Sequence, residues 1–260
     1  TGYSTLTEVA MPTIMGISGN DSLEGTAGDD YIDGLLGDDI LIGDGGGDTL
    51  NGGDGSDTAS YENSAAAVTV DLGASGGPTA TGGDAAGDTL SSIENLIGSA
   101  YVDDLTGDAG DNTIEGLAGG DDIDGGAGSN DTASYEHSTA GVTIDLGAVG
   151  GPTASGGHAA GDTLTGIENL IGSDFNDSLT GDTDDNVIHG LDGHDSITGG
   201  DGKDTLFGGG GADTLTGQNG NDTLYGGDNS DFLDAGSGDD TLYGGSGNDS
   251  ATGDDGDDLL

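Results

Sequence analysis

The fold is decided by residues 199–225, which read GGDGKDTLF, GGGGADTLT and GQNGNDTLY, three consecutive blocks of nine. Gly is first in each block, Asp is sixth and Leu is eighth. The same frame gives ten units over 172–260, five over 16–60 and four over 98–134, with the last unit of the chain lacking its ninth residue. A short, fixed period of this kind predicts a solenoid, in which each repeat stacks on its neighbours.

Two segments of 37 residues interrupt the frame, and they are identical at 28 of 37 positions. In the first, Val68 to Leu72 alternate as in a strand, while 88–98 resembles a widened repeat. Residues 1–15 lie outside the frame. We therefore divide the chain into an N-terminal cap or docking segment (1–15), a first block (16–60), a first insert (61–97), a second block (98–134), a second insert (135–171) and a third block (172–260).

The composition excludes an ordinary globular core. The 260 residues carry 44 Asp and 7 Glu against one basic residue, and the formal net charge is −50. Leu, Ile, Val and Phe number only 47, which is typical of disordered chains. The charge argues against nucleic-acid and anionic-membrane partners. No stretch is apolar enough to span a bilayer, no signal peptide is recognisable, and without Cys there is no thiolate metal site.

Each block of nine joins a turn to a short strand. Its first six residues are rich in Gly, which tolerates positive φ and close backbone approach, and its last three favour β-structure around one large apolar residue. Two units form one coil of about 18 residues, and coils stack as parallel strands about 4.8 Å apart. Turns on one side therefore recur at every second unit, so Asp204 lies over Asp222 and Asp240, while Asp213 and Asp231 line the opposite edge.

Carboxylates stacked at this spacing repel one another unless a cation lies between them. Ca²⁺ accepts about six to eight oxygens in flexible geometry, and Gly-rich turns expose carbonyl oxygens beside the Asp side chains. Mg²⁺ fits less well because it demands a tight octahedron and keeps its waters. We predict a Ca²⁺ ligand at the sixth position of every unit: Asp21, Asp30, Asp39, Asp48, Asp57, Asp103, Asn112, Asp121, Asp131, Asp177, Asn186, Asp195, Asp204, Asp213, Asp222, Asp231, Asp240, Asp249 and Asp258.

The unit G-G-x-G-x-D-x-U-x, with U a large aliphatic residue, resembles the nonapeptide of RTX (repeats-in-toxin) proteins. The resemblance implies an all-β, right-handed parallel β-roll with Ca²⁺ between turns one coil apart, and export by type I secretion. The inserts resemble segments between RTX blocks of secreted proteases and alginate epimerases. Asn112 and Asn186 depart from the pattern, which removes a charge but keeps an oxygen. Asp71, Asp88, Glu94 and Asn95 of the first insert, with Asp145, Asp162, Glu168 and Asn169 of the second, are further possible ligands.

The net charge couples binding to folding. One ion per pair of stacked turns gives about 13 ions or more, whose charge of about +26 halves the negative charge of the chain. Without metal we expect the roll to repel itself and unfold, so that binding and folding are one event. Extracellular modules bind Ca²⁺ at about 10⁻⁴–10⁻³ M, so we expect the chain to fold outside the cell or at its surface, exported without an N-terminal signal peptide.

Catalysis is not expected, since the chain has four His, one Lys and neither Arg nor Cys. His189 and His194, with Asp192 or Asp195, form a possible zinc site, but exposed turn residues are the simpler interpretation. Tyr225, Tyr243, Phe207 and Phe232 are candidates for side-to-side contacts or an aromatic ladder.

We predict a structural component of a surface layer, matrix or filament, with Ca²⁺ as partner and self-association end to end through open coil edges. The alternative is a C-terminal folding and type I secretion module of a larger enzyme or adhesin. Growth of particle size with Ca²⁺ distinguishes the two.

Overall fold

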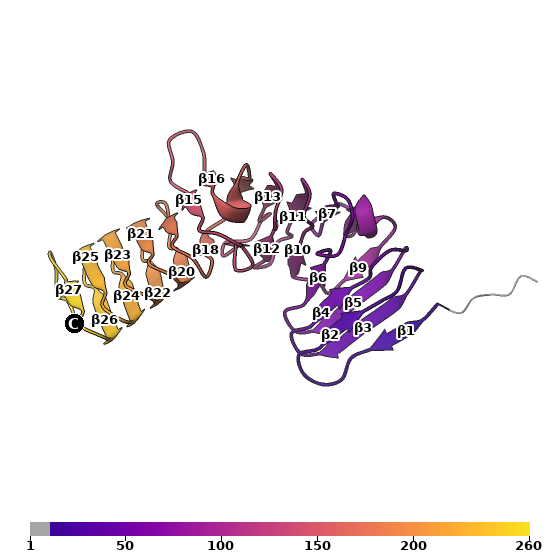
Figure 1. Cartoon of the computed structure of the whole chain (residues 1–260), viewed down its shortest axis with the longest axis horizontal. Coiled ribbons are helices and arrows are strands. Elements are labelled where there is room, and N and C mark those ends of the chain that lie inside the picture. The colour runs from indigo at the N-terminus through magenta and orange to yellow at the C-terminus, as the bar shows by residue number, and fades with distance from the viewer. Residues whose placement is uncertain (1–10) are drawn as a thin grey trace, which may run out of the picture.

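Alternate repeat units form the two faces of one long solenoid (Figure 1). The structure is a computed structural model, and it describes residues 11–260. Strands one coil apart pair in parallel, as in Leu206 with Leu224 and Leu215 with Leu233. The prediction of an all-β parallel β-solenoid with 18 residues per coil is thus confirmed. Helix is confined to two short 3₁₀ turns, η1 and η2, within the described residues.

One face is a single sheet of 11 strands, called here the continuous sheet. Its strands, in spatial order, are β2 (Ser22–Glu24), β4 (Ile40–Ile42), β6 (Thr58–Ser60), β10 (Asn95–Ile97), β12 (Thr113–Glu115), β14 (Thr132–Ser134), β18 (Asn169–Ile171), β20 (Val187–Asp192), β22 (Thr205–Gly210), β24 (Thr223–Asp228) and β26 (Thr241–Ser246).

The opposite side, called here the divided face, consists of three separate sheets. The first holds β1 (Thr13–Met15), β3 (Tyr31–Leu36), β5 (Thr49–Asp54) and β9 (Thr89–Ser91). The second holds β8 (Thr79–Thr81), β7 (Thr69–Asp71), β11 (Asp104–Thr106), β13 (Asp122–Asp124) and β17 (Thr163–Thr165). The third holds β16 (Thr153–Ser155), β15 (Thr143–Asp145), β19 (Ser178–Thr180), β21 (Ser196–Asp201), β23 (Thr214–Asn219), β25 (Phe232–Ser237) and β27 (Ser250–Thr252).

The inserts create the breaks in the divided face. After β6 the chain forms β7, which pairs with the later strand β11, and returns through the antiparallel strand β8 and η1 (Gly83–Ala85). Only then does β9 pair with β5, and β10 with β6. The second insert repeats this path through β15, β16, η2 (Gly157–Ala159), β17 and β18.

Each insert therefore adds two strands to the divided face that have no counterpart on the continuous sheet. Because the extra strands lengthen only one side, the solenoid bends at each insert. Figure 1 shows the resulting arc, with the continuous sheet toward its inner side.

The core is a narrow double row of side chains at the eighth position of each unit. Leu206, Leu215 and Leu224 are fully buried between the faces, and the same position is filled by Ile, Leu or Ala elsewhere. At the inserts the core also contains a buried Tyr, Tyr61 in the first and Tyr135 in the second.

Two local expectations differ from the structure. Strands β20 to β26 of the third block extend over six residues rather than three, because the first three residues of the next unit continue the pairing. Thr13–Met15 also continues the frame, since β1 pairs with β3 as strands one coil apart do elsewhere. The rest of the predicted cap or docking segment, 1–10, lies outside the described residues.

Glycine is required where consecutive coils approach most closely. Gly220, at the fourth position of its unit, has φ +146°, and a Cβ there would overlap the carbonyl oxygen of Gly202 one coil earlier. The Gly-rich half of the repeat thus permits coils to stack at strand spacing.

Candidate metal sites

The predicted ligands lie in two rows along the turns, one row at each edge of the solenoid. The continuous-side ladder precedes the strands of the continuous sheet: Asp21, Asp39, Asp57, Glu94, Asn112, Asp131, Glu168, Asn186, Asp204, Asp222, Asp240 and Asp258. The divided-side ladder precedes strands of the other face: Asp30, Asp48, Asp88, Asp103, Asp121, Asp162, Asp177, Asp195, Asp213, Asp231 and Asp249.

One hydrogen bond recurs along both ladders. Except at the insert residues Asp88, Glu94, Asp162 and Glu168, the backbone N–H of a ladder residue donates to a side-chain oxygen of the ladder residue one coil further on, as from Asp204 to Asp222 Oδ1 at 2.9 Å and from Asp222 to Asp240 Oδ1 at 2.7 Å. The predicted stacking of Asp204, Asp222 and Asp240 is therefore what the structure shows. The bond fixes each carboxylate beneath its neighbour and leaves the second oxygen free.

That second oxygen is the unusual feature of the site. Twelve ladder carboxylates have a buried oxygen without a hydrogen-bond partner, which is Oδ2 in all but Asp30, where Thr26 binds Oδ2 and Oδ1 is left: Asp30, Asp39, Asp48, Asp57, Asp121, Asp131, Asp195, Asp204, Asp213, Asp222, Asp231 and Asp240. Buried polar atoms are normally paired, and a buried charge is normally paired or bound to a metal. A row of orphaned carboxylate oxygens therefore fits a row of cations.

The space beside each free oxygen is lined by further oxygen and kept open by Gly. A Cβ added at Gly226 would lie 2.5 Å from Asp231 Oδ2 and 2.6 Å from the carbonyl oxygen of Gly244 in the next coil. Gly208 is placed in the same way, 2.5 Å from both Asp213 Oδ2 and the Gly226 carbonyl oxygen. Carboxylate and carbonyl oxygens from successive turns are the donor set that Ca²⁺ prefers.

The electrostatics point the same way. Burial, together with a smaller effect of neighbouring carboxylates, raises the pKa of Asp121, Asp195 and Asp204 to about 7. Burial likewise raises the pKa of Asp48 and Asp222 to about 6. These charged forms are destabilised by the protein alone, so a bound cation would stabilise them.

The inserts contribute residues to both ladders. Asp48 N–H donates to Asp88 Oδ1 at 2.8 Å, and Asp57 N–H donates to Glu94 Oε2 at 2.9 Å. Asp162 and Glu168 of the second insert make the equivalent bonds. The signal in the sequence is the triplet Asp88-Thr-Leu, which repeats the sixth to eighth positions of a regular unit.

A buried Tyr supports the insert carboxylate. The Tyr61 hydroxyl donates to Asp88 Oδ2 at 3.2 Å, and the Tyr135 hydroxyl donates to Asp162 Oδ2 at 3.1 Å. Burial raises the pKa of both Tyr side chains well above its usual value, so they remain proton donors. The sequence carries no signal for this role, because the partner carboxylate lies 27 residues away in an irregular segment.

The remaining predicted ligands are in the ladders but have no orphaned buried oxygen: Asp21, Asp103, Asn112, Asp177, Asn186, Asp249 and Asp258. Asp103 follows the first insert and accepts hydrogen bonds from Val68 N–H and from the N–H and hydroxyl of Ser99. Asp177 is bound in the same way by Ser173. These two carboxylates are satisfied by protein donors.

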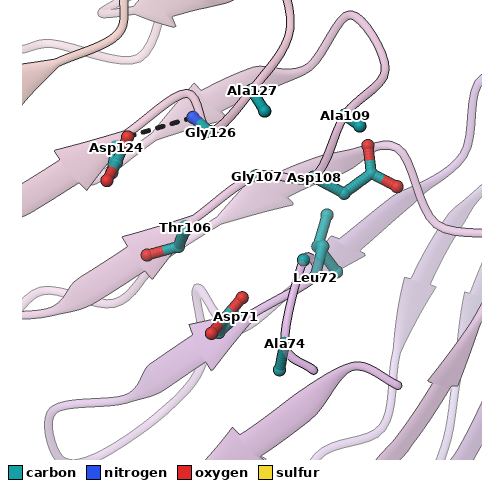
Figure 2. Close-up of a pocket in the computed structure, with 11 residues that line it drawn as sticks. Asp71, Leu72, Ala74, Thr106, Gly107, Asp108, Ala109, Asp124, Gly126 and Ala127 are labelled. Carbon is teal, nitrogen blue, oxygen red and sulfur yellow. Dashed lines mark hydrogen bonds between the residues drawn. The ribbon is translucent and has the colours of Figure 1, made fainter. Parts of the chain in front are cut away.

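Asp71 lies away from the ladders (Figure 2). It points outward from β7, beside Thr106 and in line with Asp124, in an open hollow of about 620 Å³. Asp124 Oδ1 accepts from Gly126 N–H at 3.0 Å. The hollow is lined by short side chains and contains no His, Lys or Arg.

The His189–His194 zinc site is not formed. His189 stacks on Phe207 with ring centroids 4.3 Å apart, and His194 Nδ1 accepts a hydrogen bond from Ala212 N–H. The stack continues through Tyr225 to Tyr243, whereas Phe232 lies on the divided face.

Within residues 11–260, a different group brings His and carboxylates together: Glu115, Glu136 and His137. Glu115 is 2% exposed and its Oε2 lies 2.7 Å from His137 Nδ1. The hydrogen bond to Glu115 raises the pKa of His137, and burial raises the pKa of Glu115.

Comparison with known proteins agrees with this geometry. The family model of the RTX calcium-binding nonapeptide repeat, four copies long, matches seven windows: 15–50, 25–59, 97–131, 162–197, 171–206, 198–233 and 225–260. One window begins at Asp162, where the second insert joins the ladder. A comparison with curated proteins finds no match.

RTX repeats bind Ca²⁺ in general, are typical of secreted proteins, and form β-rolls that are typically non-catalytic. No helix in the described part of the chain has the length and apolarity to cross a membrane. The windows cover well over half of the sequence, and so the chain belongs to the RTX calcium-binding nonapeptide repeat family.

Proposed function

We propose that the chain binds Ca²⁺ along both ladders and that this binding folds it outside the cell. The observation that carries the proposal is the set of twelve buried carboxylate oxygens without a partner. In the calcium-bound protein, ladder Asp and Glu oxygens and the Gly carbonyl oxygens of the next coil would hold the ions, which supply positive charge between stacked turns. About 13 ions remains our prediction for the number bound.

Charge explains why folding would follow calcium. The chain has one basic residue against 51 acidic ones, so the protein itself offers almost no compensation for a buried carboxylate. A buried charge without a partner is strongly destabilising. Extracellular modules bind Ca²⁺ at about 10⁻⁴–10⁻³ M, far above the range to which intracellular sensors respond, so the chain would stay unfolded until exported.

We further propose that the folded roll is a non-enzymatic structural component of a surface layer, matrix or filament. The support is its construction as one extended sheet backed by repeated coils. A long solenoid of this kind offers surface area and rigidity rather than an enclosed reaction site.

The test is circular dichroism with light scattering on the EGTA-treated chain, titrated with Ca²⁺ and separately with Mg²⁺. We expect a transition from coil to β-structure with Ca²⁺ alone. Growth in mass during that transition supports the structural role, whereas constant mass favours a folding and secretion module. No transition at about 10 mM Ca²⁺ refutes coupled folding for this chain.

A further inference from the structure

The regular ladder changes where the chain leaves each insert. Between the coils of Glu94 and Asn112, the backbone N–H of Glu94 donates to the Asp57 carbonyl oxygen instead of to the next ladder side chain. The hydrogen bond between these two coils is donated by the later residue instead, since Asn112 Nδ2–H donates to the Glu94 carbonyl oxygen at 2.7 Å. Asn186 Nδ2–H makes the same 2.7 Å bond to the Glu168 carbonyl oxygen.

A second Asn frees that carbonyl. In regular coils the carbonyl oxygen of a ladder residue accepts a backbone N–H from the next coil. The donor is the residue that follows the next ladder residue: the Asp195 carbonyl oxygen accepts from the N–H of Thr214, which follows Asp213, at 2.8 Å. At the junction, Thr113 N–H donates to Asn95 Oδ1 at 2.9 Å instead. Asn169 takes the corresponding bond from Val187 N–H at 2.8 Å.

We propose that these amides close the two junctions without a cation: Asn95 with Asn112, and Asn169 with Asn186, replace the Ca²⁺ ion that would otherwise lie between those coils. The proposal rests on the calcium ladders proposed above and concerns only where they are interrupted. We call each pair an amide clamp.

Two independent features support the absence of an ion. Neither Glu94 nor Glu168 has an orphaned buried oxygen, unlike the twelve Asp that do. The turn before each Glu is also shorter, since only residues 92–94 separate β9 from β10 and only 166–168 separate β17 from β18, whereas six residues, 107–112, separate β11 from β12. A cation would also meet the hydrogens of the Asn Nδ2 group, which repel it.

The side-chain oxygens of Asn112 and Asn186 accept a backbone N–H within their own turn. Asn112 Oδ1 accepts Asp108 N–H at 2.7 Å and faces the next coil, toward the Gly125 carbonyl oxygen. The Asn112 oxygen thus faces the following coil, where we propose calcium sites, and the Asn112 nitrogen faces the preceding coil, which belongs to the insert. Asp in this place would turn a carboxylate oxygen toward the Glu94 carbonyl, which explains the Asn at both junctions.

The consequence is that continuous-side ions fall into three separate runs, one in each repeat block. Anomalous diffraction from crystals grown with Ca²⁺ tests this directly. We expect peaks between regular coils and none between Glu94 and Asn112 or between Glu168 and Asn186. A peak at either junction overturns the proposal. The absence of peaks from both ladders instead refutes calcium binding itself, which is a distinguishable failure.

Variants give the same test in solution. In Asn112→Asp and Asn186→Asp we expect the Ca²⁺ midpoint of folding to rise about fivefold or more, because a hydrogen bond is lost and two oxygens face each other. Asn221→Asp makes the same change at an exposed turn position of a regular coil and is expected to leave the midpoint nearly unchanged. A lower midpoint in Asn112→Asp, as for a weak ligand improved by charge, contradicts the clamp.

Discussion

Replacing Asp213 by Asn tests the calcium ladder at its most regular point. Asp213 is 2% exposed, and its Oδ1 accepts Asp195 N–H at 2.9 Å. Its Oδ2 has no partner and lines the open space beside Gly208. The two oxygens thus face the coil before and the coil after, so the substitution weakens two neighbouring ion sites.

The magnitude follows from linkage. A ligand that binds only the folded state stabilises it by about 2.7 kcal/mol at a concentration 100 times its Kd. Losing one ion or both should therefore lower the free energy of unfolding by about 3–5 kcal/mol at that Ca²⁺ concentration. Without Ca²⁺ the substitution should no longer lower the free energy of unfolding. Burial raises the pKa of Asp213, so its negative charge destabilises the metal-free fold, and Asn removes that charge.

The assay is denaturant unfolding followed by circular dichroism, with saturating Ca²⁺ and with EGTA. Asp192→Asn is the matched control, since it removes the same charge from an exposed side chain at the end of β20 and should change stability by less than about 0.5 kcal/mol. Equal effects of Asp213→Asn and Asp192→Asn, or an equal loss for Asp213→Asn with and without Ca²⁺, would refute the reasoning.

Three further predictions concern packing, backbone and pH. Leu215→Ala removes a fully buried side chain from the narrow core and should cost about 2–5 kcal/mol in denaturant unfolding with Ca²⁺ present. Gly220→Ala should strongly lower the thermal midpoint, because its Cβ overlaps the preceding coil, while Gly28→Ala, with open space around its Cβ, should not; equal midpoints would contradict the close stacking. The raised pKa of His137 means that its bond to Glu115 stabilises the fold fully below about pH 6.5 and less as pH rises through the folded pKa. The thermal midpoint should therefore fall more with rising pH in the wild type than in His137→Asn, and parallel curves would exclude this contribution.

The nonapeptide predicts the regular coils because every stabilising contact in them is repeated one coil later. Asp204 and Asp222 have the same neighbours, so one unit determines the next. The period therefore predicts which positions point inward and which form the ladders, without knowledge of the rest of the chain.

The inserts could not be predicted in this way. Their strands pair out of chain order: β7 pairs ahead with β11, while β9 pairs back with β5 across most of the first insert. Such pairings depend on tertiary contacts that no local pattern specifies. The role of Asn112 was missed for a related reason, since its amide acts on a carbonyl that is free only in the altered turn of the insert.

Because the two faces have unequal numbers of strands, the curvature of this chain depends on how many inserts it contains. The solenoid bends where two unmatched strands are added, and those strands belong to a 37-residue segment that occurs twice. Copying the larger unit of one insert and one four-repeat block would thus lengthen the molecule and turn it further by one fixed step, whereas adding nonapeptides would only lengthen it. Length and curvature can then evolve independently of the chemistry that binds the ions.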